Sequence, residues 1–160
     1  VDEGFDAGVR LGELVTQGMI SVRVSPDIAF AVVGAPSYFS RHAAPKKPDA
    51  LHEQNCIGVR LPTHGKIYPW RFRQKGKELK FQPAGQFVCN TVFSARDACL
   101  DGIGLAYIPK IVVEEDIKNG ALISVLEPFC LTHLGFHLFY PRHHRYSMPL
   151  SLFVEEMKVK

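Results

Sequence analysis

The sequence feature that most limits the possible folds of this chain is a continuous apolar run, Ile28–Val33. Six successive apolar residues leave no polar face, which is typical of a strand that is covered on both sides. The run ends at Gly34-Ala35-Pro36, which favours a turn. Ile103–Ile108 is a second short apolar run. We therefore expect a sheet whose central strands are buried by other elements.

Helix-type segments lie between these runs. Thr91–Asp101 carries Ala95 and Cys99 at helical spacing, with Asn90 as the expected N-cap and Gly102 in the place of a left-handed C-cap. A second helix is expected from Pro109 to Asn119, and an amphipathic helix over Pro149–Lys160 closes the chain. Helices that alternate with buried strands predict an α/β fold with mostly parallel pairing.

Shorter extended segments complete the predicted sheet. A hairpin is expected from Ile67–Arg73 and Lys77–Gln82, because a glycine turn, Gln74-Lys75-Gly76, joins them. Asp49 is the expected cap of a short helix that ends near Gln54. The other predicted strands are Phe5–Leu11, Met19–Val24, Cys56–Arg60, Gln86–Cys89, Ala121–Leu126 and Phe136–Tyr140.

Composition excludes several classes of protein. Hydrophobic residues make up 46% and charged residues 22%, which is normal for a globular domain and excludes a disordered or fibrous chain. No apolar run approaches the roughly 18 residues of a membrane span. The net charge of +3 is too small to indicate nucleic-acid binding. One basic cluster stands out, and we expect it to be a solvated hairpin: Arg71, Arg73, Lys75, Lys77 and Lys80.

The four cysteines predict a reducing environment. They form no CxxC pair, and Cys56, Cys89 and Cys99 have apolar neighbours. Free buried thiols fit this pattern better than disulfides or a zinc site. We therefore expect a cytoplasmic protein. The chain starts without Met in the middle of a pattern, and its acidic first residues do not resemble a signal peptide. We interpret it as a piece of a longer protein.

Seven segments of the chain follow one another in a recognisable order. They are DAGVRLGEL (6–14), VVGAPSYFSRHAAPKKPDAL (32–51), NCIGVRLPTHG (55–65), YPWRF (68–72), ACLDGIGLAYIP (98–109), NGALISVLEPF (119–129) and GFHLFYP (135–141). In this order they resemble the effector-binding domain of LysR-type transcription regulators. The branch that the chain resembles most has the pattern Arg-Leu-Pro-Thr-Ser-Gly in the third segment, and this chain has His64 in place of the serine.

This resemblance implies a two-lobe α/β fold of the type II periplasmic-binding-protein kind. In such domains a small effector binds between the lobes, which two crossover strands connect. The first lobe is expected to combine residues 1–33 with 127–160 and to be incomplete, and the second lobe to cover 34–126. The winged helix-turn-helix of the family is expected to lie outside this chain, so that DNA is contacted only through that missing domain. The resemblance also implies a homodimer or tetramer.

Candidate ligand residues follow from where ligands bind in open α/β sheets, beyond the carboxyl ends of the strands. Arg10 could bind a carboxylate with two hydrogen bonds, although an ion pair with Asp6 or Glu13 explains it equally well. Gly12 allows close approach of a ligand. Asn90 and Thr91 begin the best-defined helix, where free amides attract anions, although Asn90 is first of all an N-cap.

Three further candidates depend on loops and on the return crossover. Thr63 offers a hydroxyl in the loop Leu61–Gly65, and His64 either retunes the choice of ligand or is an exposed loop histidine. Phe129 could wall the cleft, although such a residue is more often part of the core. The preferred ligand is a small organic anion, such as a carboxylate or an aromatic acid.

No catalytic, metal or cofactor site is expected. The late histidines His133, His137, His143 and His144 lack the carboxylate or cysteine partners of a ligand set. Cys99 lies among apolar residues in a helix, and no Gly-x-Ser-x-Gly elbow or glycine-rich phosphate loop occurs. The sequence therefore predicts a sensor domain that is not an enzyme and has no membrane partner. The alternatives are a solute-binding protein of a transport system and an enzyme on a related two-lobe scaffold.

Overall fold

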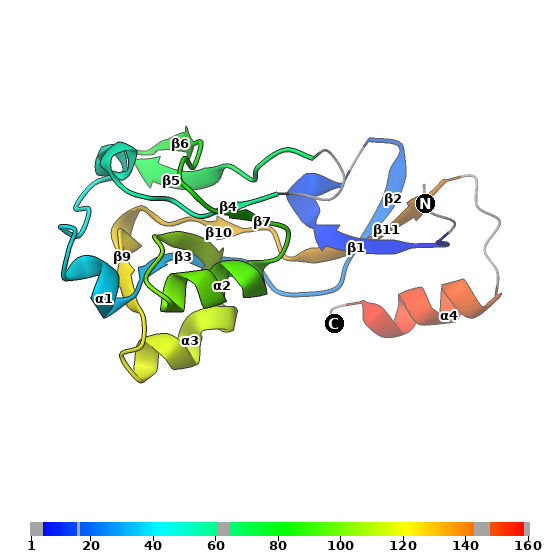
Figure 1. Cartoon of the computed structure of the whole chain (residues 1–160). Helices are drawn as coiled ribbons and strands as arrows, with labels where there is room; N and C mark the ends of the chain where they lie inside the picture. The colour runs from blue at the N-terminus through cyan, green and yellow to red at the C-terminus, as the bar shows by residue number, and fades with distance from the viewer. Residues whose placement is uncertain (1–4, 16, 61–64, 143–147, 159–160) are drawn as a thin grey trace. The chain divides into compact units, whose positions relative to one another are not determined.

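The computed structural model describes residues 5–15, 17–60, 65–142 and 148–158. It divides the chain into two compact units (Figure 1). The smaller unit comprises residues 1–28 and 132–160, and the larger unit comprises residues 29–131. Each unit has its own sheet and its own apolar core, so each is described separately.

A three-stranded antiparallel sheet forms the smaller unit, with its strands in the order β1-β11-β2. His137 on the central strand lies opposite Arg10 on one side and Arg23 on the other. The elements of this sheet and its connections are β1 (Gly8–Leu11), η1 (Gly12–Leu14), β2 (Met19–Arg23) and β11 (Phe136–Pro141). The short strand β10 (Thr132–His133) is not part of this three-stranded sheet.

One helix supplies the apolar cover of this sheet. Helix α4 (Met148–Met157) buries Leu150 and Val154, which are four residues apart and therefore lie on one face. They pack with Leu138 and Tyr140 of the central strand. The predicted closing helix is therefore confirmed for the residues that the structure describes.

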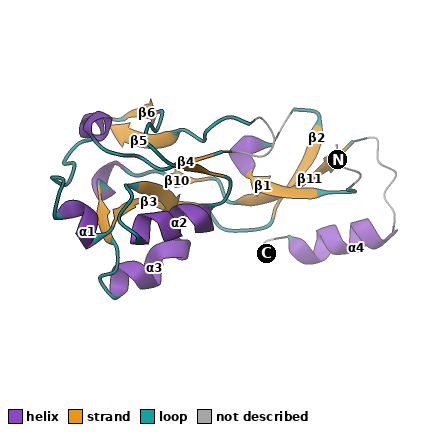
Figure 2. Ribbon diagram, viewed as in Figure 1, coloured by secondary structure: helices purple, strands orange, loops and turns teal. Residues whose placement is uncertain are grey.

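The larger unit is mixed α/β (Figure 2). Its elements are β3 (Ile28–Gly34), α1 (Pro36–Phe39), η2 (Pro48–Glu53), β4 (Gly58–Val59), β5 (Trp70–Gln74), β6 (Lys77–Phe81), β7 (Val88–Cys89), α2 (Val92–Leu100), β8 (Ala106–Pro109), α3 (Lys110–Lys118), β9 (Ile123–Val125) and η3 (Glu127–Phe129).

Strand β3 is buried from both sides, as its apolar run predicts. Ala31 and Val33 face the core that α2 and α3 form, whereas the Phe30 ring lies 4.8 Å from Tyr107 on the opposite side, where the hairpin β5–β6 packs. The two layers lie on opposite sides of β3 in Figure 1. Alternate side chains of one strand therefore hold two different layers together.

The prediction of mostly parallel pairing is wrong. Strand β3 pairs antiparallel with both β8 and β9, and β5 pairs antiparallel with β6. Parallel pairing is found, within the described residues, between β4 and β7 and at the bridge between Cys56 and Leu105. A continuous apolar run indicates only that both faces of a strand are buried. Here two layers of other elements cover β3, and such cover is compatible with either strand direction.

The hairpin has the expected turn. Lys75 and Gly76 both have positive φ, 51° and 75°, as a two-residue turn between right-twisted strands requires. Trp70, Phe72 and Phe81 are buried on its inner face and contact each other or Tyr107.

The expected cap at Asp49 is also wrong. The short helix η2 begins two residues earlier than a cap at Asp49 implies, with Lys47 as the N-cap and Pro48 in the first position. The fixed φ of proline suits that position, so Pro48 determines where the helix starts. The Asp49 side chain makes no capping hydrogen bond to η2.

A half-buried ion pair connects α2 with α3. Arg96 donates hydrogen bonds to both carboxylate oxygens of Asp116, at 2.5 and 2.7 Å. Asp116 is only 6% exposed, so its charge depends on this guanidinium. The carboxylate in turn holds the pKa of Arg96 above its usual value. Among the residues that the structure describes, no helix is long and apolar enough to span a membrane.

Arg96→Met tests this pair. It leaves the Asp116 carboxylate buried without its partner, so we expect a loss of about 2–4 kcal/mol in the free energy of unfolding. Urea titration followed by circular dichroism measures the loss. As a matched control, Lys118→Met removes the exposed pairs of Lys118 with Glu114 and Glu115 and should cost less than about 1 kcal/mol. Equal losses for the two variants would contradict the role of Arg96.

Candidate functional site

The parallel strands β4 and β7 end together at one edge of the larger unit. Gly58 lies opposite Val88, and Val59 lies opposite Cys89. The backbone amide of Arg60 donates to the carbonyl oxygen of Cys89 at 2.7 Å, which extends the pairing by one residue. Helix α2 begins just beyond this edge, which is where ligands bind in open α/β sheets.

The first turn of α2 offers free backbone amides. The Thr91 hydroxyl accepts a hydrogen bond from the amide of Ser94 at 3.0 Å. The amides of Val92 and Phe93 have no hydrogen-bond acceptor within the described residues. Such amides, together with the positive end of the helix dipole, favour an anionic group.

Thr91 is the N-cap of α2, so the expectation that Asn90 caps the helix is wrong. Thr91 stands three residues before Ser94, which is the spacing that the capping hydrogen bond requires. Asn90 lies one residue too early in the chain. It is exposed, and its side chain makes no hydrogen bond within the described part of the chain. Asn90 and Thr91 therefore lie together at this edge.

The predicted ligand residues Thr63 and His64 lie outside the described residues.

Arg10 and Gly12 lie at the end of β1 in the smaller unit. The Arg10 guanidinium carbon lies 5.0 Å from the centroid of the Phe139 ring, in a cation–π contact. Arg10 forms no ion pair within the described residues. Glu13, one of the acids considered as its partner, instead contacts Nδ1 of the buried His133 at 2.7 Å.

The space above Gly12 is already occupied. A Cβ atom at this position would lie 2.5 Å from Nδ1 of His137, so the missing side chain leaves room for the imidazole ring. Phe129 lies in η3, which packs beside β5, and it is half-buried. The structure thus groups Asn90 with Thr91 and Arg10 with Gly12, whereas Phe129 belongs to the hairpin layer.

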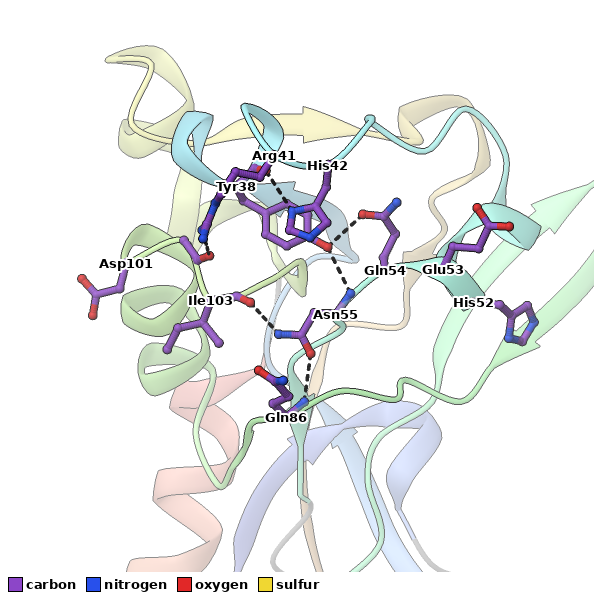
Figure 3. A pocket seen from close by; sticks show the side chains of 11 residues that line it. Tyr38, Arg41, His42, His52, Glu53, Gln54, Asn55, Gln86, Asp101 and Ile103 are labelled. Atoms are coloured by element: carbon purple, nitrogen blue, oxygen red, sulfur yellow. Dashed lines mark hydrogen bonds between the residues drawn. The ribbon is translucent and has the colours of Figure 1, made fainter.

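A polar groove of about 680 Å³ lies elsewhere in the larger unit (Figure 3). Its volume is within the range of small-molecule sites. None of the predicted site residues lines it. It is lined by Tyr38, Arg41, His42, His52, Glu53, Gln54, Asn55, Gln86, Asp101, Gly102 and Ile103.

The floor of this groove is a satisfied hydrogen-bond network. The Asn55 side chain donates to the carbonyl oxygen of Ile103 at 2.6 Å and accepts from the amide of Gln86 at 2.9 Å (Figure 3). The Tyr38 hydroxyl accepts from the amide of Asn55 and donates to Gln54. Gly104 lies against the Asn55 backbone so closely that a Cβ atom would overlap it. Sequence patterns gave no signal for this network, because its partners are far apart in the chain.

The cysteines are poor nucleophiles. All four are free, and Cys56 and Cys99 are buried. Burial raises the pKa of Cys56 and of Cys99 to about 12 and that of Cys130 to about 11. Burial also raises the pKa of Cys89. The thiols therefore stay protonated at neutral pH. The described residues contain no group of histidine, cysteine and acidic side chains that could hold a metal ion.

The sequence of residues 1–159 matches the family described as the LysR substrate binding domain. The chain belongs to this family. A LysR-family relative, the HTH-type transcriptional regulator PgrR of Escherichia coli, is 42% identical over 160 residues, which are 100% of this chain and 54% of the relative. A putative transcriptional regulator of Pseudomonas aeruginosa is 37% identical over 99% of the chain and 52% of the relative. The chain spans about half the length of these curated relatives.

Solved LysR-type structures share the fold. The regulatory domain of CrgA from Neisseria meningitidis has a TM-score of 0.74 at 23% identity and covers 98% of this chain and 75% of that one. Full-length AphB of Vibrio cholerae has a TM-score of 0.74 at 19% identity, with 97% and 52% covered. The predicted fold is therefore confirmed as that of LysR regulatory domains. The relatives are transcription regulators, which disfavours a transport protein or an enzyme.

Thr91→Ala and Asn90→Ala distinguish the observed cap from the expected one. Loss of the Thr91 hydroxyl leaves the Ser94 amide without its acceptor, so we expect a loss of about 1 kcal/mol in the free energy of unfolding. Asn90→Ala should change it by less than about 0.5 kcal/mol, because no hydrogen bond is lost. Thermal melting with both variants checks this, and the reverse order of effects would restore Asn90 as the cap.

Alkylation rates check the protonated thiols. A pKa raised by about 3 from the ordinary 9.0 lowers the thiolate fraction roughly 1000-fold. With iodoacetamide at pH 7.5, followed by peptide mass spectrometry, we expect the partly exposed Cys89 to react first. Cys56 and Cys99 should react only after unfolding in urea. Rapid alkylation of either buried thiol in the folded chain would show that a nucleophile is present after all.

Proposed function

We propose that this chain is the effector-sensing domain of a LysR-type regulator and that it binds a small organic anion. The observation that carries the proposal is the start of α2, where the amides of Val92 and Phe93 have no acceptor among the described residues, at the end of β4 and β7. A carboxylate placed there would accept from both amides. The exposed Asn90 amide would add a third donor.

The same turn favours an acid with an apolar body. Phe93 is 64% exposed in the first turn of α2. An aromatic acid could place its carboxylate on the amides and its ring near this side chain, which would remove apolar surface from water. We propose Thr91 as a further contact, since its hydroxyl lies at the same helix end. Thr63 and His64, which follow β4 in the sequence, stay predicted contacts.

In the smaller unit, Arg10 is a proposed contact for the same class of ligand. Its guanidinium makes a cation–π contact and no ion pair within the described residues, so its hydrogen-bond donors can serve a carboxylate. We propose Gly12 only as support, because it makes room for His137. We retain Phe129 as a proposed contact, but its position beside β5 favours a role in packing.

The regulatory consequence follows from differential binding. We propose that the two lobes are residues 1–33 with 127–160 and residues 34–126, and that the effector favours one of their arrangements. In the full-length protein this shift would alter DNA binding by a winged helix-turn-helix domain that lies outside this chain. Family membership supports a homodimer or tetramer as the working form. The free thiols support a cytoplasmic location.

A thermal-shift screen with small organic acids tests the proposal. A ligand at 100 times its Kd should raise the melting temperature by roughly 5–10 °C. Aromatic monocarboxylates, aliphatic dicarboxylates and matched neutral amides form the panel. We expect acids to stabilise the chain and the amides to have no effect. No shift with any acid would count against effector binding by this chain, and turnover of an acid would revive the enzyme alternative.

Asn90→Asp locates the site. It adds a negative charge beside the α2 amides with little change in shape, so we expect at least tenfold weaker binding of the selected acid. Gln82→Glu is the matched control, because it adds the same charge at an exposed position in the same unit. Equal effects of the two variants would show that binding occurs away from α2.

A further inference from the structure

Positive charge is concentrated in and next to the hairpin β5–β6. Residues 66–80 contain six cationic side chains and one carboxylate, a net charge of +5. Since the whole chain carries +3, the remaining residues together carry −2. The small net charge of the whole chain is thus compatible with one strongly basic segment. From the sequence we expect this segment to be a solvated hairpin.

The single carboxylate of this segment does not neutralise most of it. Glu78 accepts two hydrogen bonds from Arg71, at 2.7 and 3.1 Å. Lys80 lies directly opposite Arg71 in the strand register, which is an unfavourable pair of like charges. Within the described residues, ion-pair partners are lacking for Lys66, Arg73, Lys75, Lys77 and Lys80, all of which are exposed.

The basic face is presented on a rigid support. Side chains alternate along a strand, so Arg71 and Arg73 point away from Trp70 and Phe72. Those two aromatic rings lie 5.8 Å from Tyr107 of β8, and the Tyr107 hydroxyl donates to the carbonyl oxygen of Arg71 at 3.0 Å. The hairpin is therefore fixed to the core while its cations face solvent.

We propose that this basic hairpin is a docking surface for the phosphate backbone of duplex DNA. The strand register puts Arg73 and Lys80 on the outer face, with Lys75 in the turn, whereas Lys77 lies opposite Gln74 on the face of the aromatic rings. The three exposed cations Arg73, Lys75 and Lys80 complement a dense row of negative charges. The aromatic face is buried, so no base stacking is available, and binding is independent of base sequence. This goes beyond the proposed function and departs from the expectation that DNA is contacted only through the missing domain. It rests on the proposed function in one respect, since the full-length regulator would hold DNA near this domain.

Tethering makes a weak contact sufficient. A domain that is linked to a DNA-bound partner domain experiences DNA at an effective concentration near the millimolar range. A surface that meets about three phosphates then needs no high affinity of its own. The hairpin would add a salt-sensitive contact with DNA to the contact that the DNA-binding domain makes.

Fluorescence anisotropy of a labelled 20-bp duplex, titrated with the folded 160-residue chain, tests the proposal. With three cations in contact, log Kobs should fall against log salt with a slope of about −2.5 to −3, which is a loss of roughly 40-fold between 50 and 200 mM salt. A scrambled duplex should bind equally well. A slope shallower than about −1 would overturn the proposal.

Two matched double variants distinguish the effect of this surface on DNA binding from the effect of the net charge of the chain. Lys75→Glu with Lys80→Glu should weaken binding at least tenfold and flatten the slope by about two. Lys46→Glu with Lys47→Glu makes the same charge change in an exposed loop and should alter binding less than twofold. Equal losses would overturn the proposal. Poly-glutamate that competes as well as unlabelled DNA, at equal charge concentration, would assign the surface to an acidic protein instead and also overturn it.

The effector site is monitored separately. The hairpin variants should keep the thermal shift given by the selected acid, because α2 is unchanged. If the acid binds but DNA does not, only the docking surface is wrong. If neither binds, the proposed function fails as well.

Discussion

The packing of β3 between two apolar layers is the constraint on which the larger unit depends. Ala31 and Val33 hold α2 and α3 on one side, and Phe30 holds the aromatic hairpin layer on the other. Because apolar burial supplies most of the stability of such a domain, the positions of both layers follow from one strand. The start of α2, with its unpartnered amides, and the basic outer face of the hairpin are thereby fixed relative to each other within this unit.

The chemistry of the described residues suits recognition more than bond making. The thiols are held protonated by burial, and the polar side chains beneath the groove already satisfy one another. Among the described residues, backbone amides at the start of α2 and exposed cationic side chains of the hairpin are without hydrogen-bond or ion-pair partners. Both features attract anions of different size. The amides at the start of α2 fit a single carboxylate, whereas the hairpin fits a polymer of phosphates. This division agrees with membership of a family of regulators.

Local patterns predicted the elements well and their partners poorly. The run Ile28–Val33, the hairpin turn at Lys75-Gly76 and the left-handed Gly102 each depend on a few adjacent residues, so the sequence contains enough information to predict them. Strand direction around β3 depends on β8 and β9, which follow some 70 residues or more later, and no local pattern encodes it. The α2 cap was assigned one residue too early because both Asn90 and Thr91 are good caps. Of the site, the helix start and Arg10 could be found from sequence, whereas the groove network and the His137 ring over Gly12 could not.

The contact between Gly104 and Asn55 has a consequence for how such domains diverge. Asn55 joins three backbone segments, and Gly104 lies where even one added methyl group meets that backbone. A substitution at position 104 therefore depends on the backbone position at Asn55, and the reverse also holds. A heavier residue at position 104 becomes viable only where the backbone at Asn55 has already moved, so these two positions should change by paired steps.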